Sequence, residues 1–281
     1  MTKLFKKIFV EISGRCNLTC DFCRASATDH RPFMPVELFE KILVQTKNLT
    51  ERHCLHVLGE PLLHPEFEKI LMIAEKNKIQ LEITSNGLLL EKYISFFSTL
   101  KTLIQLNISV HSLSANIRTE KTFNHLKNLL PSLELLLSQN PKLFINFRFW
   151  QKNDLDQKLL SDLLSLFDEK ELSQKGKSIR LRPRLLIHFE ESFNWPSLDL
   201  PILHDNGRCH ALSSHFGILS NGIVIPCCLD SQGDIALGNI HDNDILEILK
   251  SPRALKMRES FKKKMLSEDL CKRCQYIERF K

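Results

Sequence analysis

The feature that most restricts the fold of this chain is a repeated alternation between short apolar runs and longer stretches with helical periodicity. The apolar runs are rich in branched and aromatic residues, which favour β-strands, and they cover 8–12, 54–58, 81–84, 106–110, 144–149 and, more weakly, 179–187. The helical stretches between them cover 35–49, 65–78, 88–100, 117–138 and 154–172. Strands that alternate with helices pair in parallel through right-handed crossovers. The pattern therefore predicts an α/β fold, either a doubly wound sheet or a full or partial barrel.

The chain changes character near residue 200. Glycines at 217, 222, 233 and 238 separate short apolar pieces, as in hairpins, and short helices are expected from about 243 onward. Pro196 and Pro201 mark the joint. We therefore expect two domains, residues 1–195 with the strand–helix alternation and residues 196–281 as a smaller α+β domain.

Length and composition set the class of protein. The 281 residues can bury a hydrophobic core without disulfide bonds, and 43% apolar with 26% charged residues is ordinary for a globular chain. No apolar run approaches the roughly 18 residues of a membrane span, and the N-terminal apolar run is too short for a signal peptide. We expect a cytoplasmic protein without membrane association, whose nine cysteines are reduced and serve metal binding or catalysis.

The net charge of +6 is unevenly distributed. Residues 250–281 hold eleven Lys and Arg against four Asp and Glu, a net charge of +7. A solvated helical face is the simplest explanation, and an anionic cofactor or partner is the alternative. Only Phe261, Tyr276 and Phe280 accompany these charges, which disfavours specific RNA binding without excluding nucleic acid.

Three cysteines follow directly on the first predicted strand. Cys16, Cys20 and Cys23 have the spacing CxxxCxxC, at the strand end where barrel folds place their chemistry. Structural zinc and ferredoxin-type cubanes both require four ligands, and this triplet has no adjacent fourth. Three thiolates on a cubane would leave one iron open to a substrate or cofactor.

The triplet, with the aromatic Phe22 before its last cysteine, resembles the signature of radical S-adenosylmethionine (radical SAM) enzymes. The resemblance implies a [4Fe–4S] cluster whose open iron binds SAM, reductive cleavage of SAM to a 5′-deoxyadenosyl radical, and a partial (β/α)₆ TIM-like barrel. It also implies an electron donor such as flavodoxin or ferredoxin.

Two further segments at strand ends are similar to motifs of this family. Gly59, Glu60 and Pro61 resemble the GGEP turn that accepts hydrogen bonds from the SAM ammonium group, with Leu58 in place of the first glycine. Ser85 and Asn86 lie in a Thr-Ser-Asn-Gly sequence that resembles the turn beside the SAM nucleoside.

Weaker matches concern the SAM carboxylate. Ser109 and Arg118 match, by position, a serine and an arginine that hold this carboxylate in peptide-modifying relatives. An exposed arginine at a helix start is the alternative for Arg118. His111 replaces part of the family's SLDG motif, and we interpret it as a packed histidine rather than a proton carrier.

A second set of cysteines lies in the predicted second domain: Cys209, Cys227, Cys271 and Cys274. Their spacing around Gly222 resembles the SPASM extension of radical SAM enzymes, in the shortened one-cluster form called a twitch domain. The overall layout is similar to short radical SAM dehydrogenases that oxidise an aminocyclitol alcohol. The resemblance implies an auxiliary [4Fe–4S] cluster that conducts electrons or lines the substrate cavity, and four thiolates could also hold structural zinc.

The two remaining cysteines have different expected roles. Cys54 lies in a strand pattern and is predicted to be a small buried hydrophobe. Cys228 stands where sulfatase-maturing relatives place an aspartate base, which argues against formylglycine formation. Asp230, His210 or His215 could act as a base instead, so no catalytic acid or base is assigned.

The sequence leaves the substrate open. A small molecule is mildly favoured, because only 15 residues precede Cys16 and a leader-peptide-binding domain is not expected before them. A peptide substrate presented by a separate leader-binding partner is one alternative. A non-catalytic iron–sulfur or zinc scaffold is another, although it would not explain Gly59, Glu60 and Pro61.

Overall fold

The computed structural model describes residues 3–24, 31–150 and 154–280, and it contains two compact units. The first unit comprises the described residues up to 16, residues 22–73 and the chain from 193 onward. The second comprises residues 17–21 and the described residues of 74–192. The boundary between residues 195 and 196 that the sequence suggests for two domains stays a prediction.

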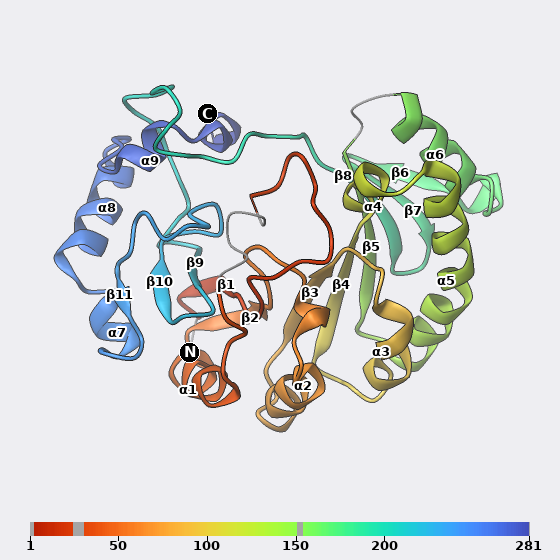
Figure 1. Cartoon of the computed structure of the whole chain (residues 1–281), viewed down its shortest axis with the longest axis horizontal. Coiled ribbons are helices and arrows are strands. Elements are labelled where there is room, and N and C mark those ends of the chain that lie inside the picture. Colours follow the sequence, from red (N-terminus) through yellow and green to blue (C-terminus); the bar gives the residue numbers. More distant parts are fainter. Residues whose placement is uncertain (1–2, 25–30, 151–153, 281) are drawn as a thin grey trace. The chain divides into compact units, whose positions relative to one another are not determined.

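The first unit contains a sheet built from both ends of the described chain. Strand β1 (Phe5–Val10) pairs in parallel with β2 (Thr50–Cys54) on one side and with β9 (His215–Ile218) on the other. Antiparallel strands β10 (Ile223–Ile225) and β11 (Gly238–Asn239) continue the sheet beyond β9. A turn at Asn221-Gly222 joins β9 to β10, in agreement with the hairpin that the glycine at 222 predicts. Through this pairing, β9 from the C-terminal part of the chain lies directly beside the first strand (Figure 1).

The helices of the first unit are short. Among its described residues they are α1 (Val36–Thr46), α7 (Ile245–Ile248), α8 (Pro252–Lys262) and α9 (Asp269–Lys272), with 3-10 turns at Pro61–Leu63 and Gln275–Phe280. Ser251 begins α8 because its hydroxyl accepts the amide hydrogen of Ala254, and Pro252 occupies the first turn. Helix α2 (Phe67–Lys76) carries the chain from the first unit to the second.

The second unit has a mixed sheet of six strands among its described residues, in the order β3 (Leu81–Ser85), β4 (Leu103–Ser109), β5 (Phe144–Phe149), β8 (Leu185–Phe189), β7 (Ser178–Arg182) and β6 (Ser173–Lys175). The first four are parallel, and β8, β7 and β6 are joined by antiparallel pairing. The parallel strands confirm the predicted α/β class.

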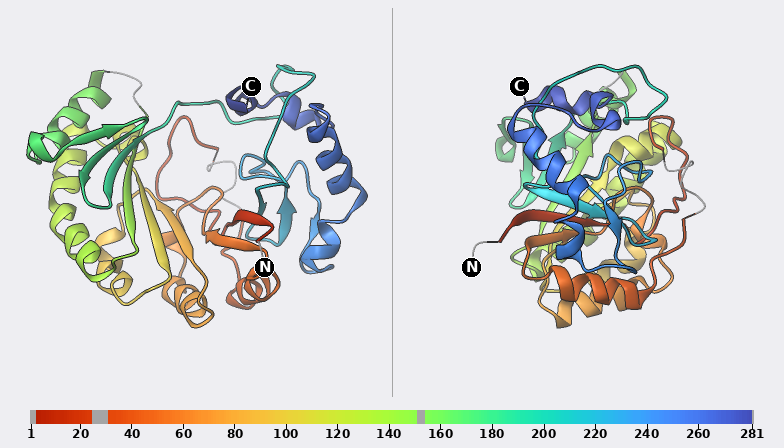
Figure 2. Two further views of the ribbon diagram at one scale, coloured as in Figure 1. Left: turned by 180° about the vertical axis from the view of Figure 1, so that it is seen from behind. Right: turned by 90° about the vertical axis from the view of Figure 1, so that its left-hand side faces the viewer.

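Helices cover one face of this second sheet (Figures 1 and 2). They are α3 (Leu90–Phe97), α4 (Val110–Asn116), α5 (Thr119–Gln139) and α6 (Asp154–Leu164), followed by a 3-10 turn at Glu169–Glu171. Helix α5 buries one stripe of leucines, at positions 126, 129, 133, 136 and 137, which matches its helical periodicity. No helix among the described residues has both the length and the apolar character that a membrane crossing requires.

Three expected elements differ from the structure. The second strand was predicted at 54–58 but runs from Thr50 to Cys54. Leu55, Val57 and Leu58 are buried in the following loop, so their apolar character indicated burial rather than strand pairing. The weak strand over 179–187 is a hairpin, turned at Arg184 in the left-handed region. The helix expected over 154–172 ends at Leu164, and α4 was not predicted.

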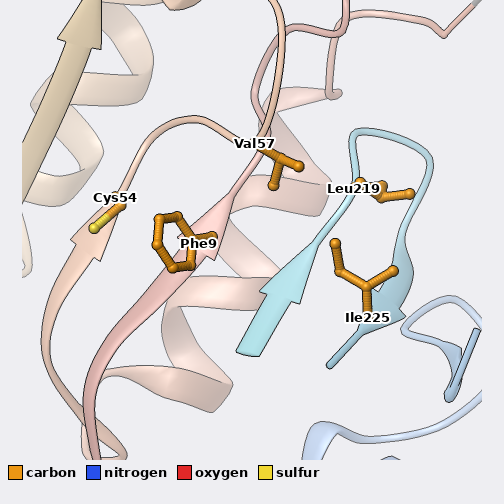
Figure 3. Packing of buried hydrophobic residues seen from close by; sticks show 5 residues of the cluster. All are labelled: Phe9, Cys54, Val57, Leu219 and Ile225. Carbon is orange, nitrogen blue, oxygen red and sulfur yellow. The ribbon is translucent and has the colours of Figure 1, made fainter. Parts of the chain in front are cut away.

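A buried cluster holds the sheet of the first unit against its loops. Phe9, Cys54, Val57, Leu219 and Ile225 pack together, with Ile223 and Cys228 partly buried against them (Figure 3). The members come from β1, β2, the loop after β2 and the β9–β10 hairpin. Cys54 is fully buried there, as expected for a small hydrophobe.

We expect Phe9→Ala to lower the free energy of unfolding by about 3–5 kcal/mol, because it leaves a cavity at the centre of this cluster. Urea unfolding followed by circular dichroism measures the change. Cys54→Ala is the matched control and removes one buried sulfur at a cost of about 1 kcal/mol. Equal losses for the two variants would contradict the central position of Phe9.

Candidate metal and cofactor centres

The loop that carries the first three cysteines follows β1. Cys16, Cys20 and Cys23 form no disulfide and have intermediate exposure, so none is sealed in the core. Cys16 and Cys23 belong to the first unit and Cys20 to the second. Loop thiols that stay partly accessible suit ligation of a cluster inserted after folding.

Cys20 has its own hydrogen-bonding environment in the second unit. The side-chain amide nitrogen of Asn116 lies 3.0 Å from Cys20 Sγ, and the thiol points toward the carbonyl oxygen of Ser112 at 3.8 Å. Burial raises the pKa of the Cys20 thiol, while the Asn116 hydrogen bond opposes that rise. Asn116 could not be recognised from the sequence, because helix α4 was not expected.

The Gly59-Glu60-Pro61 turn lies against the backbone just before Cys16. Gly59 has a φ of +72°, and a Cβ at this position would stand 2.3 Å from the Ser13 carbonyl oxygen and 2.8 Å from that of Arg15. The amide of Glu60 donates a 2.7 Å hydrogen bond to the Arg15 carbonyl oxygen. Only glycine allows the two loops to approach so closely.

The side chains of this turn have defined local roles. Glu60 is buried, and its Oε1 accepts a 3.1 Å hydrogen bond from the Leu62 amide, which begins the 3-10 turn at Pro61. Leu58, which replaces the first glycine of the resembled motif, is a buried apolar residue. Leu58 therefore contributes its side chain to the hydrophobic core, at a position where the resembled motif has a flexible glycine.

A buried carboxylate joins these loops in the first unit. Glu11 Oε2 accepts hydrogen bonds from Arg31 at 2.8 Å and from the Leu58 amide at 3.3 Å, and Oε1 accepts one from the Ser220 amide at 3.4 Å. Arg31 also donates to the Ser231 carbonyl oxygen. Burial raises the pKa of Glu11 to about 7, although Arg31 and the two amides oppose the shift.

Ser85 and Asn86 lie at the end of β3, where Asn86 contacts residues 17–21, the part of the cysteine loop that belongs to the second unit. Ser85 Oγ accepts the Gly87 amide hydrogen at 3.0 Å, and Asn86 Oδ1 accepts that of Leu88 at 3.1 Å. Asn86 Nδ2 donates to the Asn17 side-chain oxygen at 2.7 Å. The turn thus holds a residue next to Cys16.

The weaker candidates lie around the end of β4. Ser109 is buried where β4 passes into α4, and Arg118 is exposed just before α5. His111 stacks on Trp150 with ring centroids 4.4 Å apart, and its Nδ1 donates to the Arg148 carbonyl oxygen at 3.1 Å. This packing agrees with the interpretation of His111 as a packed histidine.

The four later cysteines gather in the first unit. Burial raises the pKa of Cys227 and Cys271 well above the usual thiol value, and it raises that of Cys274 to about 11. The charges of neighbouring thiols, Cys209 among them, add to each of these shifts, so the four sulfurs lie within electrostatic reach of one another. Thiols with such raised pKa values lose their protons when a positively charged metal group binds them as thiolates.

Basic and acidic groups surround this cysteine cluster. Arg253 binds Glu268 at 2.7 Å, and its charge also acts on Cys271 and Asp230. Part of the positive charge of residues 250–281 is therefore within electrostatic reach of Cys271. Lys262 and Lys272 instead pair with acidic residues of their own helices at the surface.

The candidate bases near this cluster have structural roles. Asp230 is buried with a pKa raised to about 6 by desolvation, and its two oxygens accept the amide hydrogens of Asp234 and Ile235. Burial lowers the pKa of His215 to about 4, which makes it a weak base. His210 packs edge-on against Phe280. No catalytic base is assigned.

The donor sets fit iron–sulfur chemistry. Three cysteines in one loop can hold three irons of a cubane, and the four later cysteines, which are partly exposed, can hold all four irons of another. No group of three His, Cys, Asp or Glu side chains in the described part of the chain is arranged around one metal ion.

The family comparisons agree with both cysteine sets. Residues 10–138 match the radical SAM superfamily, and residues 209–275 match the SPASM family, described as an iron–sulfur cluster-binding domain. The chain is 34% identical over 88 residues to the tungsten-containing aldehyde ferredoxin oxidoreductase cofactor-modifying protein of Pyrococcus furiosus, over 30% of this chain and 25% of that protein. It is 22% identical over 282 residues to a probable GTP 3′,8-cyclase of Methanosarcina mazei, over 85% and 82% of the two chains.

Solved structures show the same fold. BtrN in complex with AdoMet and 2-DOIA superposes with a TM-score of 0.62 at 20% identity, over 98% of this chain and 94% of that chain. SuiB of Streptococcus suis bound to precursor peptide SuiA has a TM-score of 0.59 at 16% identity, over 98% and 73%. The predicted fold class, a partial barrel of parallel strands followed by a small cluster-binding domain, is thereby confirmed.

We expect Gly59→Ala to destabilise the protein by at least about 1–2 kcal/mol, the cost of a left-handed backbone for a residue with a Cβ. The close contact with Ser13 adds to this cost. Urea unfolding measures the loss. Gly176→Ala is the matched control, since its φ is +57° and no atom lies within 4 Å of an added Cβ. An equal loss in both variants would mean that the contact with Ser13 has no energetic effect.

Glu11 predicts a pH dependence of stability. The folded state holds the Glu11 proton with a pKa of about 7, whereas the ordinary value is 4.5. Folding therefore becomes less favourable as pH rises from about 4.5 to about 7 and loses no more from this group above that range. Glu11→Gln should remove this decline in denaturation midpoints measured across the range. An unchanged decline in the variant would show that Glu11 is ionised throughout.

Proposed function

This chain belongs to the radical SAM superfamily and carries an SPASM iron–sulfur domain, and on that premise we propose that it is an enzyme that abstracts hydrogen from a substrate. The proposed cofactors act at two places: a [4Fe–4S] cluster with SAM at Cys16, Cys20 and Cys23, and an auxiliary [4Fe–4S] cluster at Cys209, Cys227, Cys271 and Cys274.

The observation that carries the proposal is the contact between the cysteine loop and the Gly59-Glu60-Pro61 turn. The Glu60 amide binds the carbonyl of Arg15, the residue directly before Cys16. A ligand chelated next to Cys16 would therefore stand close to the carbonyls and carboxylate of this turn. An amino acid ammonium group needs such acceptors.

When bound, the cluster and SAM supply a 5′-deoxyadenosyl radical by one-electron cleavage of the sulfonium. The residues of the chain bind and orient these groups. Gly59 and Glu60 would accept hydrogen bonds from the SAM ammonium group, and Ser85 and Asn86 would flank the nucleoside. Ser109 and Arg118 are proposed for the carboxylate.

The later cysteines support an oxidative outcome. All four sulfurs of Cys209, Cys227, Cys271 and Cys274 would be used as ligands, which leaves no position on that cluster for substrate. We propose that they hold an electron acceptor, so that the substrate radical loses an electron and the product is oxidised or crosslinked. The charge of Arg253, within electrostatic reach of Cys271, suits an anionic four-thiolate cluster.

The substrate class is proposed as a small molecule or a peptide. Among the structures with this fold, BtrN was crystallised with 2-DOIA and SuiB with a precursor peptide. A peptide maturase that acts with a separate leader-binding partner is therefore the second candidate. A flavodoxin or ferredoxin is the proposed electron donor, and a cytoplasmic location remains a prediction.

We expect anaerobically reconstituted protein to release 5′-deoxyadenosine when dithionite and SAM are added. Cys20→Ala should abolish this release, and Cys271→Ala should retain it, because only the first site binds SAM. Each variant should lose about half of roughly eight irons per chain. Chromatographic quantification of 5′-deoxyadenosine and colorimetric iron determination measure these outcomes.

Cys54→Ala is the control, since Cys54 is buried in the Phe9 cluster and should change neither iron content nor release. An iron-replete wild-type sample that releases no 5′-deoxyadenosine would favour a non-catalytic scaffold. If the wild-type protein contains zinc and the Cys271→Ala variant loses it, the later cysteines bind zinc and the proposed auxiliary iron–sulfur cluster is wrong. Once a substrate is known, unchanged product formation by folded Cys271→Ala protein would contradict the electron-acceptor role.

A further inference from the structure

We propose that the side-chain amide of Asn116 donates a hydrogen bond to the sulfur of Cys20 and thereby raises the reduction potential of the cluster at the first cysteine loop. This inference rests on the proposed function, because it assumes that Cys20 is a cluster ligand. It assigns Asn116 as a positioning and tuning residue, which neither its sequence position nor the motifs indicate.

The geometry of Asn116 uses every hydrogen-bonding atom of the side chain. Its Nδ2 lies 3.0 Å from Cys20 Sγ and 2.9 Å from the Ser112 carbonyl oxygen. Its Oδ1 accepts a 3.1 Å hydrogen bond from the amide of Thr19. The side chain of Asn116 therefore binds both Cys20 and the preceding residue, Thr19. Thr19, Cys20, Ser112 and Asn116 all belong to the second unit.

These partners fix the orientation of the amide. Thr19 offers only an N–H and must face the oxygen of Asn116, whereas Ser112 offers a carbonyl oxygen and must face the nitrogen. A flipped amide would place donor against donor and acceptor against acceptor. The remaining N–H of Asn116 consequently points at Cys20.

The end of helix α4 provides this arrangement. Asn116 is the last residue of α4, and Ser112 lies one helical turn earlier. The side chain of Asn116 donates one hydrogen back to the Ser112 carbonyl oxygen and reaches Cys20 with the other. The position of the donor is thus set by the helix rather than by the mobile end of a long side chain.

A donor at this sulfur acts unequally on the two oxidation states. The reduced cluster carries one more negative charge than the oxidised one, and part of that charge resides on the ligand sulfurs. An N–H aimed at the sulfur stabilises the reduced form more, which makes one-electron reduction easier. Groups that hydrogen-bond metal ligands commonly tune a site in this way.

The experiment compares wild type, Asn116→Ala and Asn116→Asp by redox titration of anaerobically reconstituted full-length protein, followed by electron paramagnetic resonance. The signal of the first cluster is the one that changes when SAM is added. Asn116→Ala should show about a tenfold lower ratio of reduced to oxidised cluster at a fixed potential, equivalent to about 59 mV for one electron. Asn116→Asp keeps an acceptor for the Thr19 amide and has no N–H. Because its carboxylate also adds a negative charge near the sulfur, its ratio should fall at least as far.

Asn140→Ala is the matched control. Asn140 also makes three hydrogen bonds with its side chain, to the carbonyls of Leu100 and Leu103 and from the amide of Lys142, but it contacts no cysteine. Its cluster potential should equal that of wild type. A shift of the same size in Asn140→Ala would mean that general loosening of the second unit, rather than the N–H to sulfur, sets the potential.

The failure of this inference is distinguishable from that of the proposed function. If no wild-type signal responds to SAM, the proposed function fails. If a signal responds and titrates at the wild-type potential in both Asn116 variants, only the role of Asn116 fails. If iron analysis shows that both variants lack the first cluster, Asn116 serves cluster assembly and the claim about the potential is overturned.

Discussion

The first unit depends on one buried carboxylate. Glu11 follows β1 and binds the amide that precedes Gly59, the amide of Ser220 after β9, and the guanidinium of Arg31. A buried charge is costly unless it is paired and hydrogen-bonded, and here three donors converge on it. The same carboxylate therefore aligns the start of the cysteine loop, the turn proposed to bind SAM and the hairpin that precedes Cys227. Burial still favours its protonated form, which sets its pKa near 7.

Much of the architecture was predictable because its signals are local. Parallel strands separated by amphipathic helices predicted the α/β class, and the order of Cys16, Gly59 and Asn86 after three strands placed the motifs in successive loops. The structure provides physical reasons for two of these residues. Gly59 is needed because a Cβ would strike Ser13, and Asn86 both stabilises its own turn and binds Asn17. The cluster-binding role proposed for the later cysteines came from their resemblance to the SPASM extension, and their mutual electrostatic influence is consistent with it.

The parts that were not predictable depend on tertiary contacts. The apolar run after Cys54 was interpreted as a strand, although burial of Leu55, Val57 and Leu58 in a loop explains it. Helix α4 has a serine-rich sequence without a clear apolar period, so neither the helix nor Asn116 could be recognised. Asp230 was a candidate base on sequence alone, and only the structure shows that both its oxygens hold the amides of a loop. Composition likewise could not show that Arg253 lies within electrostatic reach of Cys271.

The pairing of β1 with β9 also has a consequence for biosynthesis. Phe9 pairs with Gly217 in this parallel ladder. The partner strand β9 is therefore synthesised about two hundred residues after β1. Contacts between such distant segments form slowly, since a long loop must close before they contribute. During translation the nascent chain exposes one edge of β1 together with three reactive thiols. Until β9 has been made, that unpaired edge can pair with another chain, so slow or interrupted synthesis would favour aggregation.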